Sequence, residues 1–535
     1  MTADAHAIED QEQHRPAIRG VRPIIGMEVH VELGTASKMF TRARNPAADP
    51  LGAIDASDEP NARIDPMVLA LPGALPVANA RAIELSIAVG LALGCSIARI
   101  TRFDRKSYFY PDLPKAYQIS QYDEPLCAGG AVDVPAFNDR GEPVLDGPAH
   151  RVRITRAHLE EDAGKLLHEA PGGGAIDHSI VDLDRAGTPL LEIVTEPDFE
   201  TAEQAVAFCR LLRSTIRLMG ASACVLQAGQ MRFEPNINCE LALEDGSVVR
   251  TPIVEVKNLN SYRAVRGAIE HEIRAQPERW REDGREMGPG AKRTFGWDDA
   301  TLRTVPQREK EDAQDYRYFP DPDLPPVRVT ETMLAAARSR VGTPWLARLH
   351  ALHGELDVGV ADAALVLSDS DVGALFDGAL DALADAGVDR AAAAGGLANA
   401  ITQTAARLSR ERGVALGRLA ITAAQLAGVV RLRLDGALSN QGAADLFAEL
   451  VERDDAGLDA EGLARELGIL LVRDDAAIDA WCRAAIDAHP QAADEVRGGK
   501  PQAIGRLIGQ AMKSAGGSGD PKAIRARLLE ILAGG

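Results

Sequence analysis

The stretch GMEVHVEL, residues 26–33, places Glu28 and His30 two positions apart in an alternation of polar and apolar residues. If the stretch is a β-strand, its period of two puts both side chains on one face and the apolar side chains on the other. A carboxylate and an imidazole held together on a rigid element form half of a site for a divalent cation. The alternative is a strand with one solvated face that carries them incidentally, and the spacing alone favours this alternative.

The composition describes an ordinary globular protein with more than one domain. A chain of 535 residues is too long for a single core, so we expect roughly two to four domains. No apolar run approaches the ~20 residues of a membrane helix. Residues 1–20 are polar and lack an apolar signal core, which predicts a disordered extension of a cytoplasmic protein.

Charge and cysteine content exclude several classes of protein. The net charge of -20 argues against a protein that coats nucleic acid over its whole surface, although it permits a local basic patch. The six cysteines lie far apart, and no two have the spacing of a zinc knuckle. We therefore expect neither a disulfide framework nor a structural zinc. We expect the protein to lie in a reducing compartment.

Three regions differ in sequence texture. Residues 21–330 mix short β-branched runs with glycine and proline, which predicts an α+β domain. Residues 331–430 are rich in alanine and leucine at helical spacing, and residues 431–535 continue as short helices. Within the first region, helices are expected after the capping residues Asn79 and Thr201.

Two acidic stretches in the first region need partners. Glu192 lies inside the apolar run LLEIV, where an unpaired carboxylate is costly to bury. Glu160, Glu161 and Asp162 are consecutive, and such neighbours repel one another by about 1 kcal/mol per pair even in water. A metal ion or a lysine or arginine pair would relieve the repulsion. Together with His30, these mostly oxygen ligands favour Mg²⁺ or Mn²⁺ over structural zinc.

A third stretch, FDRKSYFYPDLPKAYQISQYD at 103–123, interleaves cations with aromatic rings. Lys106, Tyr108, Tyr110 and Lys115 suit an anionic and partly planar ligand such as a nucleotide. The alternative is a solvent-exposed β-turn. The chain contains no GxxxxGK[ST], GxSxG or GxGxxG, so neither a P-loop nor a hydrolytic nucleophile is indicated, and any ammonia taken from an amide donor must come from another protein.

The end of the chain is locally basic. Between positions 497 and 527 it carries one acidic residue, Asp520, and an apolar helical face. The basic residues of this segment are Arg497, Lys500, Arg506, Lys513, Lys522, Arg525 and Arg527. This pattern fits a patch for phosphate contacts and fits equally well a solvated helix surface.

These stretches, with DRAGTPLLEIVTEPD (184–198), MRFEPNINCEL (231–241), DYRYFPDPDLPP (315–326) and GKPQAIGRLIGQAMKSAGGSGDP (499–521), closely resemble the B subunit of the aspartyl/glutamyl-tRNA(Asn/Gln) amidotransferases, the GatB family. The resemblance spans nearly the whole chain. It implies a catalytic domain similar to glutamine synthetase, with an antiparallel sheet and helices, followed by an all-α domain and a small all-α tail that binds tRNA. The tail residues that it assigns to tRNA are Lys500, Arg506, Lys513 and Lys522.

The resemblance also implies an activity. In the family this polypeptide uses ATP and Mg²⁺ to phosphorylate the side-chain carboxylate of Glu-tRNA(Gln) or Asp-tRNA(Asn). Ammonia from the amidase (glutaminase) subunit then displaces phosphate, and another, small subunit makes the complex a heterotrimer. The positions that match the family's catalytic metal ligands are Glu28, His30, Glu161 and Glu192. The positions that match its nucleotide and acceptor-end pocket are Lys106, Tyr108, Tyr110 and Lys115.

The sequence departs from the family at a four-cysteine zinc site that many members carry. The corresponding positions are Thr41, Ala43, Asp65 and Val68, so we expect no zinc and a loop held by other contacts. Two alternatives remain: a stand-alone carboxylate–amine ligase for a small metabolite, and an RNA-binding scaffold with a vestigial metal site. The basic tail argues against the first, and the intact ligand set against the second. The choice between Glu-tRNA(Gln) and Asp-tRNA(Asn) stays open.

Overall fold

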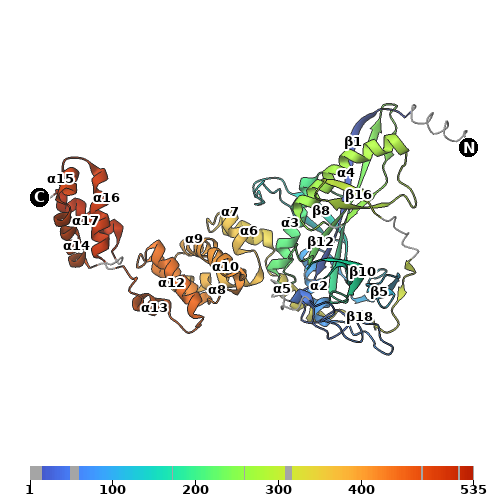
Figure 1. Cartoon of the computed structure of the whole chain (residues 1–535), viewed down its shortest axis with the longest axis horizontal. Helices are drawn as coiled ribbons and strands as arrows, with labels where there is room; N and C mark the ends of the chain where they lie inside the picture. Colours follow the sequence, from blue (N-terminus) through green and yellow to red (C-terminus); the bar gives the residue numbers. More distant parts are fainter. Residues whose placement is uncertain are drawn as a thin grey trace, which may run out of the picture. The chain divides into compact units, whose positions relative to one another are not determined.

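The computed structural model describes residues 15–48, 59–170, 173–257, 259–307, 316–471, 474–515 and 519–533. The chain divides into two compact units between Arg348 and Leu349 (Figure 1). Of the expected disordered extension 1–20, residues 1–14 lie outside the described residues, and Ile18 already begins the first strand. Among the helices of the described residues, none is long and apolar enough to cross a membrane.

An eleven-stranded sheet organises the first unit, in the order β16-β15-β14-β12-β1-β11-β8-β6-β2, with β13 beside β12 and β7 beside β8. Its strands are β1 (Ile18–Glu32), β2 (Ser96–Ile97), β6 (Cys127–Ala128), β7 (Ala131–Val134), β8 (His150–Glu161), β11 (Pro189–Thr195), β12 (Met231–Leu243), β13 (Val248–Arg250), β14 (Val254–Lys257), β15 (Arg293–Asp298) and β16 (Arg303–Pro306). Three small sheets are formed by β3 (Ile100–Thr101), β4 (Asp104–Ser107), β5 (Tyr117–Ser120), β9 (Lys165–Glu169), β10 (Ala175–Asp182), β17 (Phe319–Pro320) and β18 (Val327–Arg328).

The large sheet is mixed, which corrects the expected antiparallel sheet. β14 and β15 pair in parallel, whereas the other pairs in this sheet are antiparallel. Parallel neighbours need a crossover connection, and helix α4 (Tyr262–Asp283) supplies it between these two strands. The coarser prediction, sheet and helices first and helices alone afterwards, is confirmed.

Strand β1 lies between β11 and β12 in the middle of the sheet. Its predicted alternation is confirmed, because Met27, Val29 and Val31 are at most 1% exposed while Glu28 and His30 lie on the other face. The apolar face is covered by helices: Phe233 of β12, which pairs with Val29, packs its ring 5.9 Å from that of Tyr262 in α4. The polar side chains of the same strands therefore lie on the opposite face of the sheet.

The helices of the first unit begin where the capping signals place them. Asn79 accepts hydrogen bonds from the first-turn amides of α2 (Ala80–Ala92), and Thr201 forms a capping box with Gln204 at the start of α3 (Ala202–Leu218). Helix α5 (Glu331–Val341) packs against α2, so the first unit extends past the domain limit expected at residue 330. A 3₁₀ turn η1 (Pro46–Ala48) completes the unit, and α6 (Trp345–Gly354) contains the division.

The second unit is helical throughout its described residues. Its helices are α7 (Val360–Val366), α8 (Ser370–Asp385), α9 (Arg390–Asn399), the π-helical η3 (Ala400–Ala405), α10 (Ala406–Arg412), η4 (Leu416–Arg418), α11 (Ala423–Leu434), α12 (Asn440–Arg453), α13 (Ala460–Glu466), α14 (Asp475–Ala488), α15 (Pro490–Arg497), η5 (Pro501–Ala503), α16 (Ile504–Ser514) and α17 (Pro521–Ala533). One core joins α11 to α13, and another joins α14 to α17. The expected limit at residue 430 therefore falls inside α11.

Direct contacts join the loop segments at the four positions where many family members have zinc-binding cysteines. The hydroxyl of Thr41 donates a hydrogen bond to the carboxylate of Asp65, which also accepts one from the amide of Val68 at 2.9 Å. Val68 is buried in a small apolar cluster to which Ala43 contributes. The hydrogen bonds of Asp65 and an apolar contact thus hold together segments that lie more than 20 residues apart in the sequence.

We expect Asp65→Ala to lower the free energy of unfolding by about 1–3 kcal/mol, because it removes both hydrogen bonds and leaves Thr41 and the Val68 amide without their acceptor. Asp133→Ala is the matched control, since Asp133 forms an exposed ion pair with Arg151, which contributes little to stability. Urea-induced unfolding of the full chain measures both. Equal stability of the two variants would show that the hydrogen bonds of Asp65 do not stabilise the fold.

Candidate active site

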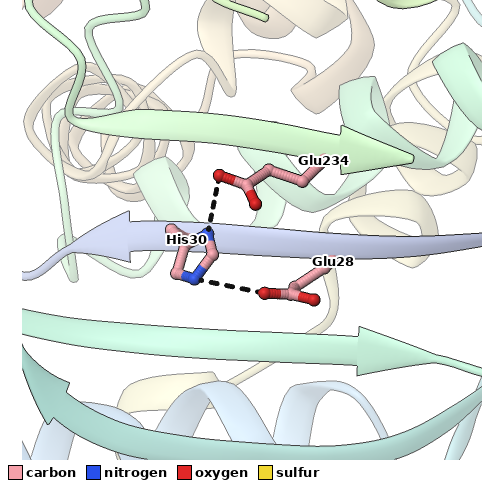
Figure 2. Close-up of side chains that lie close together, drawn as sticks. All are labelled: Glu28, His30 and Glu234. Atoms are coloured by element: carbon pink, nitrogen blue, oxygen red, sulfur yellow. Dashed lines mark ion pairs between the residues drawn. The ribbon is translucent and has the colours of Figure 1, made fainter. Parts of the chain in front are cut away.

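Four carboxylates from four neighbouring strands surround His30. Glu192 of β11 pairs directly with His30 across the sheet, and Glu234 of β12 pairs with Glu28. The imidazole Nε2 lies 3.4 Å from Glu192 Oε2, 3.6 Å from Glu28 Oε1 and 4.0 Å from Glu160 Oε1 of β8. Its Nδ1 lies 3.9 Å from Glu234 Oε1 (Figure 2). We call these five residues the glutamate cluster.

Burial and mutual repulsion perturb the titration of the glutamate cluster. Burial and the charge of Glu192 raise the pKa of Glu28 to about 7. Burial lowers the pKa of His30, but the hydrogen bond to Glu192 and the surrounding carboxylates outweigh it and raise this pKa to about 9. The raised pKa favours the protonated imidazole among the carboxylates, and within the described residues its buried Nδ1 has no hydrogen-bond partner.

This donor set fits a metal ion. Two groups have ligand atoms that all lie within 4.8 Å of one another: Glu28, His30 and Glu234, and His30, Glu160 and Glu192. Carboxylate oxygens with one imidazole nitrogen suit Mg²⁺ or Mn²⁺. A divalent cation would compensate the carboxylates without a protonated His30 and would give its ring nitrogen a partner.

Cations at the rim of the cluster compensate part of its charge. Lys257 Nζ lies 2.8 Å from Glu234, and Arg156 lies 3.8 Å from Glu192. Burial lowers the pKa of Lys106, but the charges of Glu160 and Glu192 outweigh this effect and leave the pKa raised. Lys106 is thus held as a cation, in position to meet an anionic ligand that approaches the carboxylates.

Glu161 does not join the glutamate cluster. Because side chains alternate along β8, Glu160 faces His30 whereas Glu161 points to the opposite face of the strand. Lys115 Nζ lies 2.7 Å from Glu161, and the amide of Ile119 donates to the same carboxylate at 3.0 Å. Of the four residues predicted as metal ligands, the structure brings together Glu28, His30 and Glu192.

Two members of the cluster, Glu160 and Glu234, escaped the sequence reasoning. Glu160 was named only as part of an acidic run, and the parity of the strand would have separated it from Glu161. Glu234 lies in MRFEPNINCEL, whose polar residues alternate at every second position. That alternation marks a strand with one polar face, but the sequence does not reveal that this strand lies beside β1.

The predicted nucleotide-pocket residues divide between two places. Lys106 lies 5.3 Å from the ring of Tyr316, and Tyr108 packs edge-on against the same ring at 6.4 Å. Tyr110 is 48% exposed, and Lys115 is paired with Glu161. The aromatic surroundings of Lys106 thus include Tyr316, which lies in the stretch DYRYFP and which the sequence analysis does not single out.

The basic residues of the tail are exposed on α15 to α17 and η5. Lys500, Arg506, Lys513 and Lys522 all lie at the surface, as does Arg525. The remaining two are compensated: Arg497 pairs with Asp494 at 3.0 Å, and Arg527 pairs with Asp479 at 2.7 Å. The apolar face predicted for this segment packs inward, with Ile504 and Leu507 buried in the core of α14 to α17. The candidate phosphate-binding surface is therefore smaller than the count of seven suggests.

Two family models and several known proteins match the chain. The family model described as GatB/GatE catalytic domain matches residues 23–335, and the one described as GatB domain matches residues 382–532. The B subunit of the aspartyl/glutamyl-tRNA(Asn/Gln) amidotransferase of Rhodopirellula baltica is 39% identical over 96% of this chain and 97% of that protein. The protein of the same name from Thermomicrobium roseum is 40% identical over 95% of this chain and 97% of its own length. The chain therefore belongs to the GatB/GatE family.

Proposed function

We propose that this chain is the B subunit of a tRNA-dependent amidotransferase, a carbon–nitrogen ligase that uses glutamine as its amide donor. Its substrate is the misacylated Glu-tRNA(Gln) or Asp-tRNA(Asn), and its product is Gln-tRNA(Gln) or Asn-tRNA(Asn). The observation that carries the proposal is the glutamate cluster, in a chain similar to proteins of this name over nearly its whole length. The exposed basic tail favours a nucleic-acid substrate over a small metabolite.

The reaction proceeds in two steps. A carboxylate is a poor electrophile, so its oxygen first takes the γ-phosphoryl group of ATP, which gives an acyl phosphate and ADP. Ammonia then attacks the acyl carbon, the new C–N bond replaces the C–O bond to phosphate, and a proton is lost. An amidase (glutaminase) subunit supplies the ammonia, since no hydrolytic nucleophile motif is present in this chain, and another, small subunit makes up the heterotrimer.

The glutamate cluster would hold the magnesium ion through Glu28, His30, Glu192 and the newly assigned Glu160 and Glu234. When bound, Mg²⁺ offsets the repulsion between the phosphate oxygens and the incoming carboxylate. Lys106 contributes a fixed positive charge beside that position, and Tyr108 and Tyr316 provide the aromatic wall against which a planar group can pack. Shielding from water matters here, because hydrolysis of an acyl phosphate wastes the ATP.

Further parts of the proposal rest on the family resemblance. The first unit is proposed to share the glutamine synthetase fold and to bind ATP near Lys106, Tyr108 and Tyr110. We propose that no zinc is bound at Thr41 and the three positions associated with it, because none of them carries a thiolate. The tail residues Lys500, Arg506, Lys513 and Lys522 are proposed to contact tRNA phosphates, and the complex to act in the cytoplasm.

Glu28→Gln is expected to lower misacylated-tRNA-dependent ATP hydrolysis by about 100-fold or more, because it removes a charged ligand from the magnesium site. Glutamine hydrolysis by the amidase should stay measurable. The reconstituted heterotrimer provides both assays, with Glu244→Gln, an exposed residue near Arg19, as the control. Normal formation of amidated tRNA by Glu28→Gln would refute the metal assignment.

Glu160 and Glu161 are adjacent in sequence and are expected to behave differently. Glu160→Gln should weaken Mn²⁺ binding about tenfold or more, because it removes an oxygen that faces His30. Glu161→Gln should leave the affinity nearly unchanged, since Glu161 lies on the other face with Lys115. Electron paramagnetic resonance of free Mn²⁺ measures both without any turnover. The reverse order of effects would return Glu161 to the ligand set.

Replacing Lys500, Arg506, Lys513 and Lys522 together by glutamine should weaken tRNA binding and make its salt dependence shallower, by up to about 0.9 in slope for each phosphate that is no longer neutralised. Filter binding of the heterotrimer at several salt concentrations tests this. Arg483→Gln combined with Arg497→Gln is the control, since both arginines already have carboxylate partners. An unchanged slope in the fourfold variant would make the tail ordinary surface.

A further inference from the structure

A pocket of about 630 Å³ lies on the helix-covered face of the large sheet. Its walls are the N-terminal parts of α3 and α4, the end of β7 with residues that follow it, and His150 of β8. Tyr262 in this pocket packs against Phe233, whose neighbour Glu234 points to the opposite face with His30. The sheet therefore separates the pocket from the glutamate cluster, and the proposed function assigns it no role.

Arg210 of α3 is held in the pocket by two aromatic rings. Its guanidinium carbon lies 4.5 Å from the ring centre of Tyr262 and 6.0 Å from that of Phe137. Gly141 passes close above the guanidinium, with a positive φ of 79°, where a β-carbon would collide with Arg210. Because the side chain is already oriented by these contacts, it would lose little entropy on binding an anion.

The positive charge of the pocket is only partly compensated. Three arginines and two acidic residues, Glu203 and Asp139, line the pocket. Arg266 pairs with Glu203 at 3.0 Å, but neither Arg210 nor Arg263 has an ion-pair partner within the part of the chain that the structure describes. The positive ends of the α3 and α4 helix dipoles add to this charge, because both helices begin at the pocket. Uncompensated cations of this kind, in a chain of net charge -20, indicate an anionic ligand.

The remaining lining has an apolar part and a polar part. Val134, Pro135, Pro148, Val206 and Ala207 form the apolar wall beside the two rings, and Asn138, Asp139, His150 and Gln204 are polar. A cavity of this size that combines an apolar wall with convergent charged groups is typical of a site for a small organic molecule. An oriented guanidinium recognises a carboxylate or phosphate by paired hydrogen bonds. The apolar wall would pack against an apolar or flat part of the same ligand.

We propose that this pocket is a second ligand site, which binds a small organic anion: a carboxylate or phosphate carried on a flat or apolar body. Arg210 and Arg263 bind the anion, and the apolar wall with Phe137 and Tyr262 packs against the body. The site does not depend on the proposed function, because it shares no residue with the glutamate cluster.

Isothermal titration of the full chain with four probes tests the chemistry of the site. Phenyl phosphate and benzoate carry both features, inorganic phosphate lacks the body, and benzyl alcohol lacks the charge. We expect saturable binding of at least one aromatic anion, about tenfold or more tighter than the binding of inorganic phosphate and of benzyl alcohol. The proposal would be overturned if neither aromatic anion bound saturably. It would also be overturned if inorganic phosphate bound as tightly as the aromatic anions.

Variants place the binding in the pocket. Arg263→Ala should weaken the aromatic anion about tenfold, whereas Arg274→Ala, an equally exposed arginine on α4 outside the pocket, should not. Ala136→Trp fills the cavity from its exposed rim and should also abolish binding, while Glu28→Gln on the other face should leave binding unchanged. Unaltered binding in both pocket variants, or loss in Glu28→Gln, would assign the anion to another site.

Discussion

The repulsion among four glutamates that converge on His30 is the constraint on which the first unit depends. Each carboxylate comes from a different strand, so the sheet must hold four strands in one register to bring them together. Charges at these distances interact strongly once water is excluded, and only added positive charge makes the arrangement stable. Protonated His30, Lys257 and Lys106 provide part of that charge. The negative charge that these cations leave uncompensated supports the proposal of a cation site.

The strand period explains how a sheet can carry such a cluster without losing its core. Met27, Val29 and Val31 bury one face of β1 under helices, and the same period turns Glu28 and His30 to the other. In the central strands, the residues that stabilise the fold thus lie on one face, and the polar residues of the candidate site lie on the other. A shift of one residue in the register of any of them would exchange the two faces, so the apolar packing itself fixes where the carboxylates meet.

Local features of this fold follow from the sequence, and long-range ones do not. The strand around His30, the capped starts of α2 and α3 and the need of Glu192 for a partner all arise from residues close together in the chain. That Glu234 lies beside Glu28 depends on a pairing across some 200 residues, which no local pattern encodes. The choice of Glu161 over Glu160 is a different case, since it treats adjacent carboxylates as one group, whereas strand parity places them on opposite faces of β8. Likewise, the sequence predicts Arg527 as part of a basic surface, whereas in the structure it is paired with Asp479, 48 residues away.

The zinc-site positions and the helix-face pocket show why a family resemblance cannot replace the structure. The resemblance indicates that cysteines are missing at Thr41 and Asp65, but only the folded chain shows that a hydrogen bond between these two residues connects the same segments. It is also silent on Arg210, because Phe137 and Tyr262, which orient it, lie on two other segments. An arginine on a helix is ordinary in sequence. It can bind a ligand only because folding places it against two rings, without a carboxylate partner among the described residues, in a pocket large enough for a ligand.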